Sequence, residues 1–134
     1  MTVKKKMDGM VKKMVMNGKT NTLSQSFKHQ ASFQKLVTGA NCPGDNLEQF
    51  SYHIQAMVEE LGEVVKADKR WKTHRNERYL VEEKLDEIAD VFITAMNIAM
   101  HSGFDSETIE KAISDKIQKN FERLQKATEK EKIK

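Results

Sequence analysis

Apolar residues recur every three or four positions along most of the chain, which is the spacing of one face of an α-helix. This pattern predicts four helices, which cover about residues 26–37, 45–71, 79–101 and 105 onward. Gly39 and Gly103 act as stop signals after the first and third of them. Asp45 and Asp105 stand where N-caps of the second and fourth are expected. No segment alternates apolar and polar residues as a strand does, so the predicted fold class is all-α, a helical bundle of about four helices.

The two ends of the chain differ from these helices. Residues 1–26 hold six lysines and five of the eight methionines. This leader is either a short basic amphipathic helix that ends near Gly18 or a frayed terminus. Residues 128–134 are charged or polar except for one isoleucine and are expected to fray. One domain, residues 27–127, remains between them.

The predicted third helix has two faces of different character. Its expected core face carries six apolar residues: Val81, Leu85, Ala89, Phe92, Met96 and Ala99. The opposite side carries Glu83, Asp86, Glu87 and Asp90. Residues 91–100 contain no charged side chain, and a helix that is apolar on every side is buried. We therefore expect Asp90 to lie at the mouth of a buried region, with the acidic stripe continued inward by Thr94 and Asn97.

Two pairs of carboxylates have the i, i+3 spacing that places side chains on one helical face. Glu60 and Glu63 form the first pair, and Glu87 and Asp90 form the second. Four carboxylates in a partly dry site repel one another, and burial favours their protonation unless a cation is bound. Oxygen ligands without histidine or cysteine suit Mg²⁺, with Mn²⁺ as a substitute. The alternative is two solvated faces balanced by nearby lysines, among them Lys66, Lys69 and Lys84.

A polar, mostly cationic stripe follows the apolar stripe of the predicted fourth helix. Lys116, Asn120 and Arg123 stand at i, i+4 and i+7, so they share one side of the helix. Such a stripe can neutralise phosphate oxygens. It can equally be an ordinary solvated surface.

Together these elements resemble the MazG-like, all-α nucleoside triphosphate pyrophosphatases. Glu-Leu-Gly-Glu at 60–63 and Glu-Ile-Ala-Asp at 87–90 are similar to the ExxE and ExxD motifs of that family. The cationic stripe is similar to its phosphate-contact helix, so the likeness covers residues 47–124. The resemblance implies that Glu60, Glu63, Glu87 and Asp90 hold Mg²⁺. It also implies that water attacks the α-phosphorus of a nucleoside triphosphate and releases a monophosphate and pyrophosphate.

The resemblance also suggests roles for single residues. Either Glu60 or Glu63 acts as the base, and the sequence does not choose between them. The expected phosphate or sugar contacts are Lys116, Asn120 and Arg123. Candidate base contacts are His53 and Trp71, which could stack on a base, and Asn97, which could hydrogen-bond base or sugar. The alternative for these last three is ordinary packing.

Two other functions remain open beside the broad pyrophosphohydrolase. The related dimeric dUTPases and dCTPases share the acid pattern and a helix that ends in tryptophan, so a pyrimidine-specific enzyme is one alternative. The other is a helical-bundle interaction protein without enzymatic activity. Members of the family pair, so the resemblance implies a homodimer or homotetramer, with outer apolar residues such as Val91 and Ile98 covered by a partner.

Charge and composition limit the kinds of partner and the cellular location that we expect. The net charge is +3, but residues 1–35 carry +7 and the remainder carries −4. A mildly acidic main domain argues against stable nucleic-acid binding. No apolar stretch has the roughly 20 residues of a membrane span. The single cysteine, Cys42, indicates a reducing compartment, so a cytoplasmic location is expected.

Overall fold

The computed structural model describes residues 2–15, 20–72, 74 and 79–133. These residues form helices and no strand, so the predicted all-α class is confirmed for the described part of the chain. The five helices are α1 (Val3–Val15), α2 (Leu23–Thr38), α3 (Leu47–Asp68), α4 (Val81–Met100) and α5 (Ser106–Ile133).

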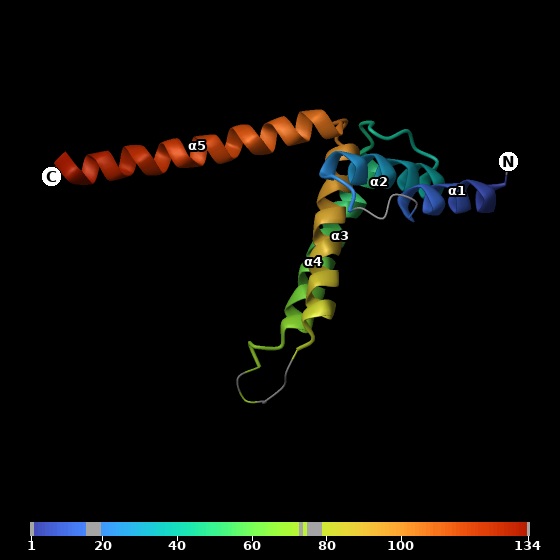
Figure 1. Ribbon diagram of the computed structural model, residues 1–134, viewed down its shortest axis with the longest axis horizontal. Helices are drawn as coiled ribbons and strands as arrows, with labels where there is room; N and C mark the ends of the chain where they lie inside the picture. The colour runs from blue at the N-terminus through green and yellow to red at the C-terminus, as the bar shows by residue number, and fades with distance from the viewer. Residues whose placement is uncertain (1, 16–19, 73, 75–78, 134) are drawn as a thin grey trace.

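α3 and α4 form an antiparallel pair, which is the most extensive contact between two helices (Figure 1). We call this pair the hairpin. α2 lies across the end of the hairpin at which α3 begins and α4 ends, and α1 lies beside α2. α5 starts at the same end of the hairpin and extends to the side opposite α1 (Figure 1). Its main contact is with α2. The chain is therefore angular, with the hairpin and α5 as two arms.

The leader contains a helix, α1, as one of its two alternatives expected, and Gly18 lies outside the described residues. Other predicted boundaries need correction. α2 begins earlier than predicted because Thr22 is its N-cap. α3 is capped by Asn46 rather than Asp45, since the Asn46 side-chain oxygen accepts from the Gln49 amide at 3.0 Å. α5 continues through Ile133, where fraying was expected.

Other local signals are confirmed. Asp105 caps α5, because its Oδ1 accepts a hydrogen bond of 2.9 Å from the Thr108 amide. Gly39 ends α2 in the left-handed region with φ of 72°, and its amide donates to the Lys35 carbonyl. Glycine takes this conformation without the strain that a Cβ would add.

The interior of the chain is small and mixed in polarity. Among the described residues the buried apolar side chains are Phe27, Ala67 and Met100. Six polar residues are buried with them: Gln34, His53, Thr94, Asn97, His101 and Ser106. Burial of Thr94 and Asn97 confirms that the acidic stripe of α4 continues into the interior.

The predicted core face of α4 is wrong. Val81, Leu85 and Phe92 are each 65% exposed, because α4 turns its opposite, polar side toward α2 and α3. The hydrophobic pattern correctly marked a coherent apolar face. It did not reveal that the described helices leave most of this face exposed, with only a groove between it and α1 and α2.

Two stacked histidines join α2 to the end of the hairpin. The rings of His53 and His101 lie parallel within 3°, with centroids 5.4 Å apart. Gln34 Oε1 accepts from Nε2 of His53 at 3.3 Å and from Nε2 of His101 at 3.5 Å. Because Gln34 Oε1 can only accept, each Nε2 atom is the donor in its contact and carries a proton. Burial lowers the pKa of both histidines, and the charge of His101 lowers that of His53 further.

Acid should therefore weaken the fold. In the unfolded chain both imidazoles bind protons below the reference pKa of 6.5, whereas the folded protein resists protonation. Stability contributed by the neutral pair is present above pH 6.5 and is lost as the pH falls below it. We expect a lower melting temperature at pH 5.5 than at pH 7.5, and a smaller drop in His53→Gln. The control is His74→Gln, which alters an exposed histidine. If the melting temperature of both variants fell equally between pH 7.5 and pH 5.5, burial of His53 would not be the cause of the acid sensitivity.

Candidate functional site

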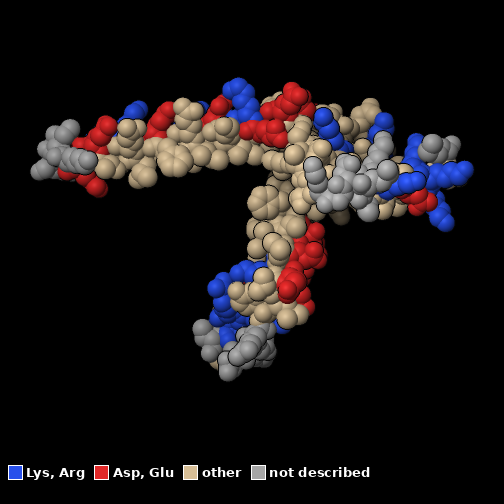
Figure 2. All heavy atoms as spheres, in the orientation of Figure 1, with Lys and Arg blue, Asp and Glu red and all other residues tan. Residues whose placement is uncertain are grey.

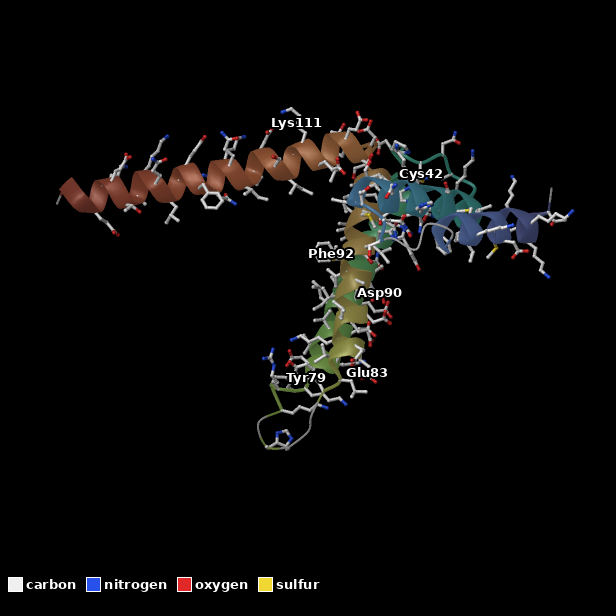
Figure 3. The ribbon with its side chains drawn as sticks, viewed as in Figure 1. Cys42, Tyr79, Glu83, Asp90, Phe92 and Lys111 are labelled. Atoms are coloured by element: carbon white, nitrogen blue, oxygen red, sulfur yellow. The ribbon has the colours of Figure 1, made fainter. Side chains whose placement is uncertain are left out.

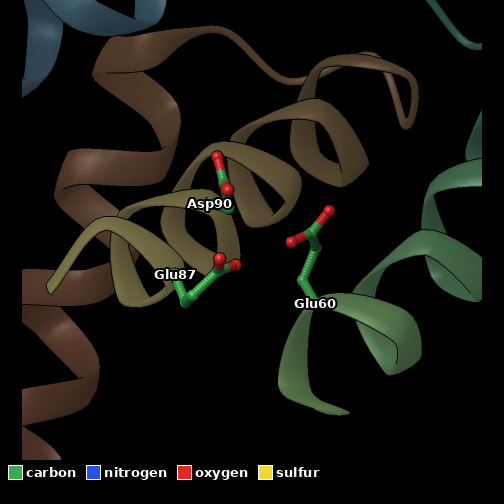
Figure 4. A group of neighbouring side chains, drawn as sticks. All are labelled: Glu60, Glu87 and Asp90. Atoms are coloured by element: carbon green, nitrogen blue, oxygen red, sulfur yellow. The ribbon is translucent and has the colours of Figure 1, made fainter. Parts of the chain in front are cut away.

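Three carboxylates converge between the two helices of the hairpin. Glu60 comes from α3, and Glu87 and Asp90 come from adjacent turns of α4 (Figure 4). One oxygen of each lies within 4.8 Å of the others. We call these residues the acidic triad. The antiparallel arrangement of α3 and α4 brings them together, because Glu60 lies on the side of α3 that carries the buried His53 and Ala67.

The acidic triad carries charge that the chain does not compensate. Partial burial raises the pKa of Glu60 and of Glu87, and the negative charge of Asp90 raises each of them further. Within the described part of the chain, no lysine or arginine forms an ion pair with any triad member. A cation is the simplest means of relieving this repulsion, and all-oxygen donors suit Mg²⁺.

The neighbouring lysines do not fill this role. Lys66 lies 3.5 Å from Glu63, and Lys84 lies 2.6 Å from Asp68. The ion pair of Lys66 agrees with the solvated-face alternative at Glu63, whereas neither of these two lysines pairs with the triad.

Asp68 fixes the geometry of the hairpin near its loop. Its oxygens accept hydrogen bonds of 2.7 Å from Nε and Nη2 of Arg70 and pair with Lys84. These partners hold the pKa of Asp68 well below its usual range. The ion pair joins the end of α3 to α4 one turn before Glu87, and so helps to keep Glu87 opposite Glu60.

Glu63 lies beside the triad but is not part of it. Its charge contributes to the raised pKa values of Glu60 and Glu87. Together with Glu83, Asp86 and Glu87 it lines a shallow pocket of about 350 Å³. The structure thus groups three of the four predicted ligands and leaves the fourth adjacent.

The candidate base contacts are scattered. His53 is 5% exposed and Asn97 is 4% exposed, and Asn97 Oδ1 accepts from Gln30 Nε2 at 3.1 Å. Their burial counts against direct contact with a nucleobase. Trp71 is exposed, but it lies beyond the end of α3, where its Nε1 donates to the Val65 carbonyl at 2.8 Å.

The predicted phosphate contacts do not reach the triad within one chain. Lys116, Asn120 and Arg123 lie on the exposed part of α5, which points away from the hairpin (Figures 1 and 2). A site that contains both the acids and these residues requires more than one copy of the chain.

Sequence reasoning missed the polar interior behind the site. Gln30, Gln34 and His101 bind Asn97 and His53 there, at the junction of α2 with the hairpin. One signal was available: Gln34 follows Phe27 by seven residues and so shares its helical face.

Comparison with known proteins gives no further information on the family or function of the chain. The chain matches no protein-family model, no curated protein and no solved structure. Within the described residues, no helix combines the length and the apolar character needed to cross a membrane.

Removing one triad carboxylate should change stability in opposite directions with and without metal. Glu87→Gln relieves repulsion, so the metal-free variant should melt above the wild type at pH 7.5. The wild type should gain stability from Mg²⁺, about 2.7 kcal/mol at a hundredfold excess over Kd, and the variant should gain much less. Differential scanning fluorimetry with and without Mg²⁺ measures both effects. Glu59→Gln, a matched change on the exposed side of α3, should keep the Mg²⁺ response; a wild-type melting temperature unaffected by Mg²⁺ would argue against a metal site.

Proposed function

We propose that this protein is a Mg²⁺-dependent nucleoside triphosphate pyrophosphohydrolase of the MazG-like, all-α type. The observation that carries the proposal is the acidic triad, in which residues from two separate sequence motifs meet within 4.8 Å. The same two motifs carry the resemblance to that family, so sequence and geometry support one site. The proposed reaction converts a (d)NTP and water to a (d)NMP and pyrophosphate.

In this proposal each residue has a defined task. Glu60, Glu87 and Asp90 hold Mg²⁺, which when bound screens the triphosphate charge and activates water. Mn²⁺ can replace it because the donors are all oxygen. Membership of Glu60 in the triad favours Glu63 as the base that takes the proton of the attacking water. The charge of Glu63 acts on Glu60 and Glu87, which agrees with a position beside the proposed metal.

Lys116, Asn120 and Arg123 remain the proposed phosphate contacts. Because α5 carries them away from its own hairpin, they would serve the acidic triad of another copy. This requirement supports the homodimer or homotetramer that the resemblance implies.

The test is pyrophosphate release from canonical, deoxy and modified triphosphates, each with Mg²⁺ and with EDTA. We expect Mg²⁺-dependent release of pyrophosphate, with the monophosphate as the second product. Turnover restricted to dUTP or dCTP would select the pyrimidine-specific alternative. Release of inorganic phosphate in place of pyrophosphate would contradict attack at the α-phosphorus.

The non-enzymatic alternative rests on a separate observation. Large apolar residues are exposed along α1, α3, α4 and α5, as in a protein whose surface serves association. Folded protein that binds Mg²⁺ but hydrolyses no triphosphate on the panel would favour this interaction-protein alternative.

A further inference from the structure

α1 has the weakest contact with the rest of the chain. The close contacts between helices join α3 to α4, α2 to α4 and α2 to α5, and α1 takes part in none of them. It lies beside α2 and extends outward from the end of the hairpin (Figure 1). None of its described residues belongs to the acidic triad or to the buried interior. The sequence of α1 therefore needs an explanation outside the fold and the candidate site.

An exposed apolar stripe runs along α1. It consists of Val3, Met7, Met10 and Val11. At 100° per residue these four positions fall within an arc of about 100°. Val3 and Val11 are each 59% exposed and Met7 is 47% exposed, so the described helices do not bury the stripe. Beside it lies a groove of about 670 Å³ between α1, α2 and α4, in which Leu23 and Phe33 are also half exposed.

Lysines surround the stripe on the remaining sides of α1. Four of them are exposed: Lys4, Lys5, Lys6 and Lys12. Lys4 lies about 20° beyond one edge of the stripe, and Lys6 lies about 40° beyond the other. Asp8 is the one acidic residue of α1. Lysines at such edges can lay their apolar stems along the stripe and keep their amines in a polar layer.

A hollow lined by lysines lies between α1 and α2. Its volume is about 570 Å³, and Lys5, Lys6 and Lys35 line it, with no acid among the described residues around it. Met10 lines both this hollow and the apolar groove, so cationic and apolar surfaces adjoin at α1. α2 adds a second exposed lysine, Lys28, and contains no acidic residue. A partner that matches both surfaces has negative charge next to apolar chains.

The acidic residues lie in another part of the molecule. In Figure 2 lysines gather on α1, whereas acidic residues follow one edge of the hairpin. Asp90 and Glu83, which are labelled in Figure 3, lie along the hairpin and away from α1. Residues 1–35 hold eight lysines and one acid, for a charge of +7. A negatively charged surface is therefore attracted to α1 and α2 and repelled by the acidic edge of the hairpin.

We propose that α1, together with the adjoining surface of α2, binds a membrane surface that contains anionic lipids. α1 lies in the plane of the interface, where its apolar stripe enters the boundary between headgroups and acyl chains and its lysines contact lipid phosphates. With 13 residues α1 is shorter than the roughly 20 residues of a span, so the helix lies on the membrane and does not cross it. This inference is independent of the proposed function.

An anionic bilayer matches α1 better than a soluble polyanion does. RNA or heparin offers charge to the lysines but no apolar layer to the stripe. A plane of headgroups contacts the lysines at both edges of the stripe at once, while the acyl chains below receive Met7 and Val11. The apolar side chains of the stripe are few, so charge should supply much of the affinity, and salt should weaken it.

Co-sedimentation of the full chain with lipid vesicles tests the binding. We expect binding to vesicles of phosphatidylcholine and phosphatidylglycerol at low salt. Binding should be at least about tenfold weaker to phosphatidylcholine alone, and also weaker at about 0.5 M NaCl. The double variant Lys5→Glu, Lys6→Glu should bind the anionic vesicles at least about 30-fold more weakly than the wild type.

The matched control is the double variant Lys126→Glu, Lys130→Glu. It makes the same change in net charge on the exposed part of α5, and it should bind within about threefold of the wild type. Equal affinity for both kinds of vesicle, or an equal loss in the two double variants, would overturn the proposal. Binding to heparin without binding to vesicles would also overturn it and would assign the lysines to a soluble polyanion.

Fluorescent labelling tests which side of α1 meets the lipid. In a Cys42→Ser background, Met7→Cys places an NBD label on the stripe, and Lys12→Cys places it on the polar side of the helix. We expect anionic vesicles to shift NBD emission to shorter wavelength at position 7 and to leave it unchanged at position 12. The same response at both positions would contradict insertion of the stripe. Neither measurement depends on hydrolysis, so an inactive protein leaves both outcomes interpretable.

Discussion

Asp90→Asn should lower Mg²⁺-dependent pyrophosphate release by roughly 10²–10³-fold, the loss typical when one preorganised electrostatic group leaves an active site. Asp90 belongs to the acidic triad, and its charge raises the pKa of both Glu60 and Glu87. Asparagine keeps the shape of the side chain and removes one negative charge. The measurement is kcat/KM for the best triphosphate of the panel at saturating Mg²⁺.

The control for this substitution is Asp115→Asn. Asp115 lies on the exposed surface of α5 and pairs with Lys111 at 2.7 Å, far along the chain from the triad. It should retain wild-type activity, and circular dichroism should show both variants folded. Activity of Asp90→Asn within about threefold of the control would remove Asp90 from the site.

Phe27→Ala should destabilise the protein by about 3–5 kcal/mol, the range for truncation of a buried phenylalanine. Phe27 is one of the few buried apolar side chains of the described chain. It lies beside Pro43, Asp105 and Ser106, between α2, the turn before α3 and the start of α5. Its loss leaves a cavity at the point from which both arms extend.

Urea unfolding at fixed protein concentration measures this effect. Phe104→Ala is the matched control, since Phe104 is 47% exposed and its truncation leaves no comparable cavity. We expect the control to lose about 1 kcal/mol or less. Equal losses in both variants would show that Phe27 does not have a special role in the junction.

Local sequence signals predicted the helices well, and the reason is physical. Helical periodicity and a cap such as Asp105 act within a few residues, so a single segment contains the information. The pairing of Glu60 with Glu87 and Asp90 was also predictable, because each motif places its acids on one face and a helix pair brings the two faces together. The sequence could not show that Glu60 joins the triad and Glu63 does not. The two residues are less than one helical turn apart, so the pattern places them on the same face.

The interior was less predictable for a reason seen in Leu85 and Phe92. A hydrophobic stripe shows that a face must be buried, but it does not say whether the same chain buries it. Sequence reasoning assigned these residues to the core of one chain, and the structure exposes them. His53 shows the converse: the sequence left both a ligand contact and ordinary packing open, and burial with a hydrogen bond to Gln34 favours packing.

The small interior formed by Phe27, Ala67 and Met100 also bears on the life of the protein in a cell. A single copy exposes apolar residues along its helices, the kind of surface that chaperones bind and proteases attack. A substitution that weakens this interior is therefore expected to lower the amount of protein in the cell before it changes any chemistry at the acidic triad.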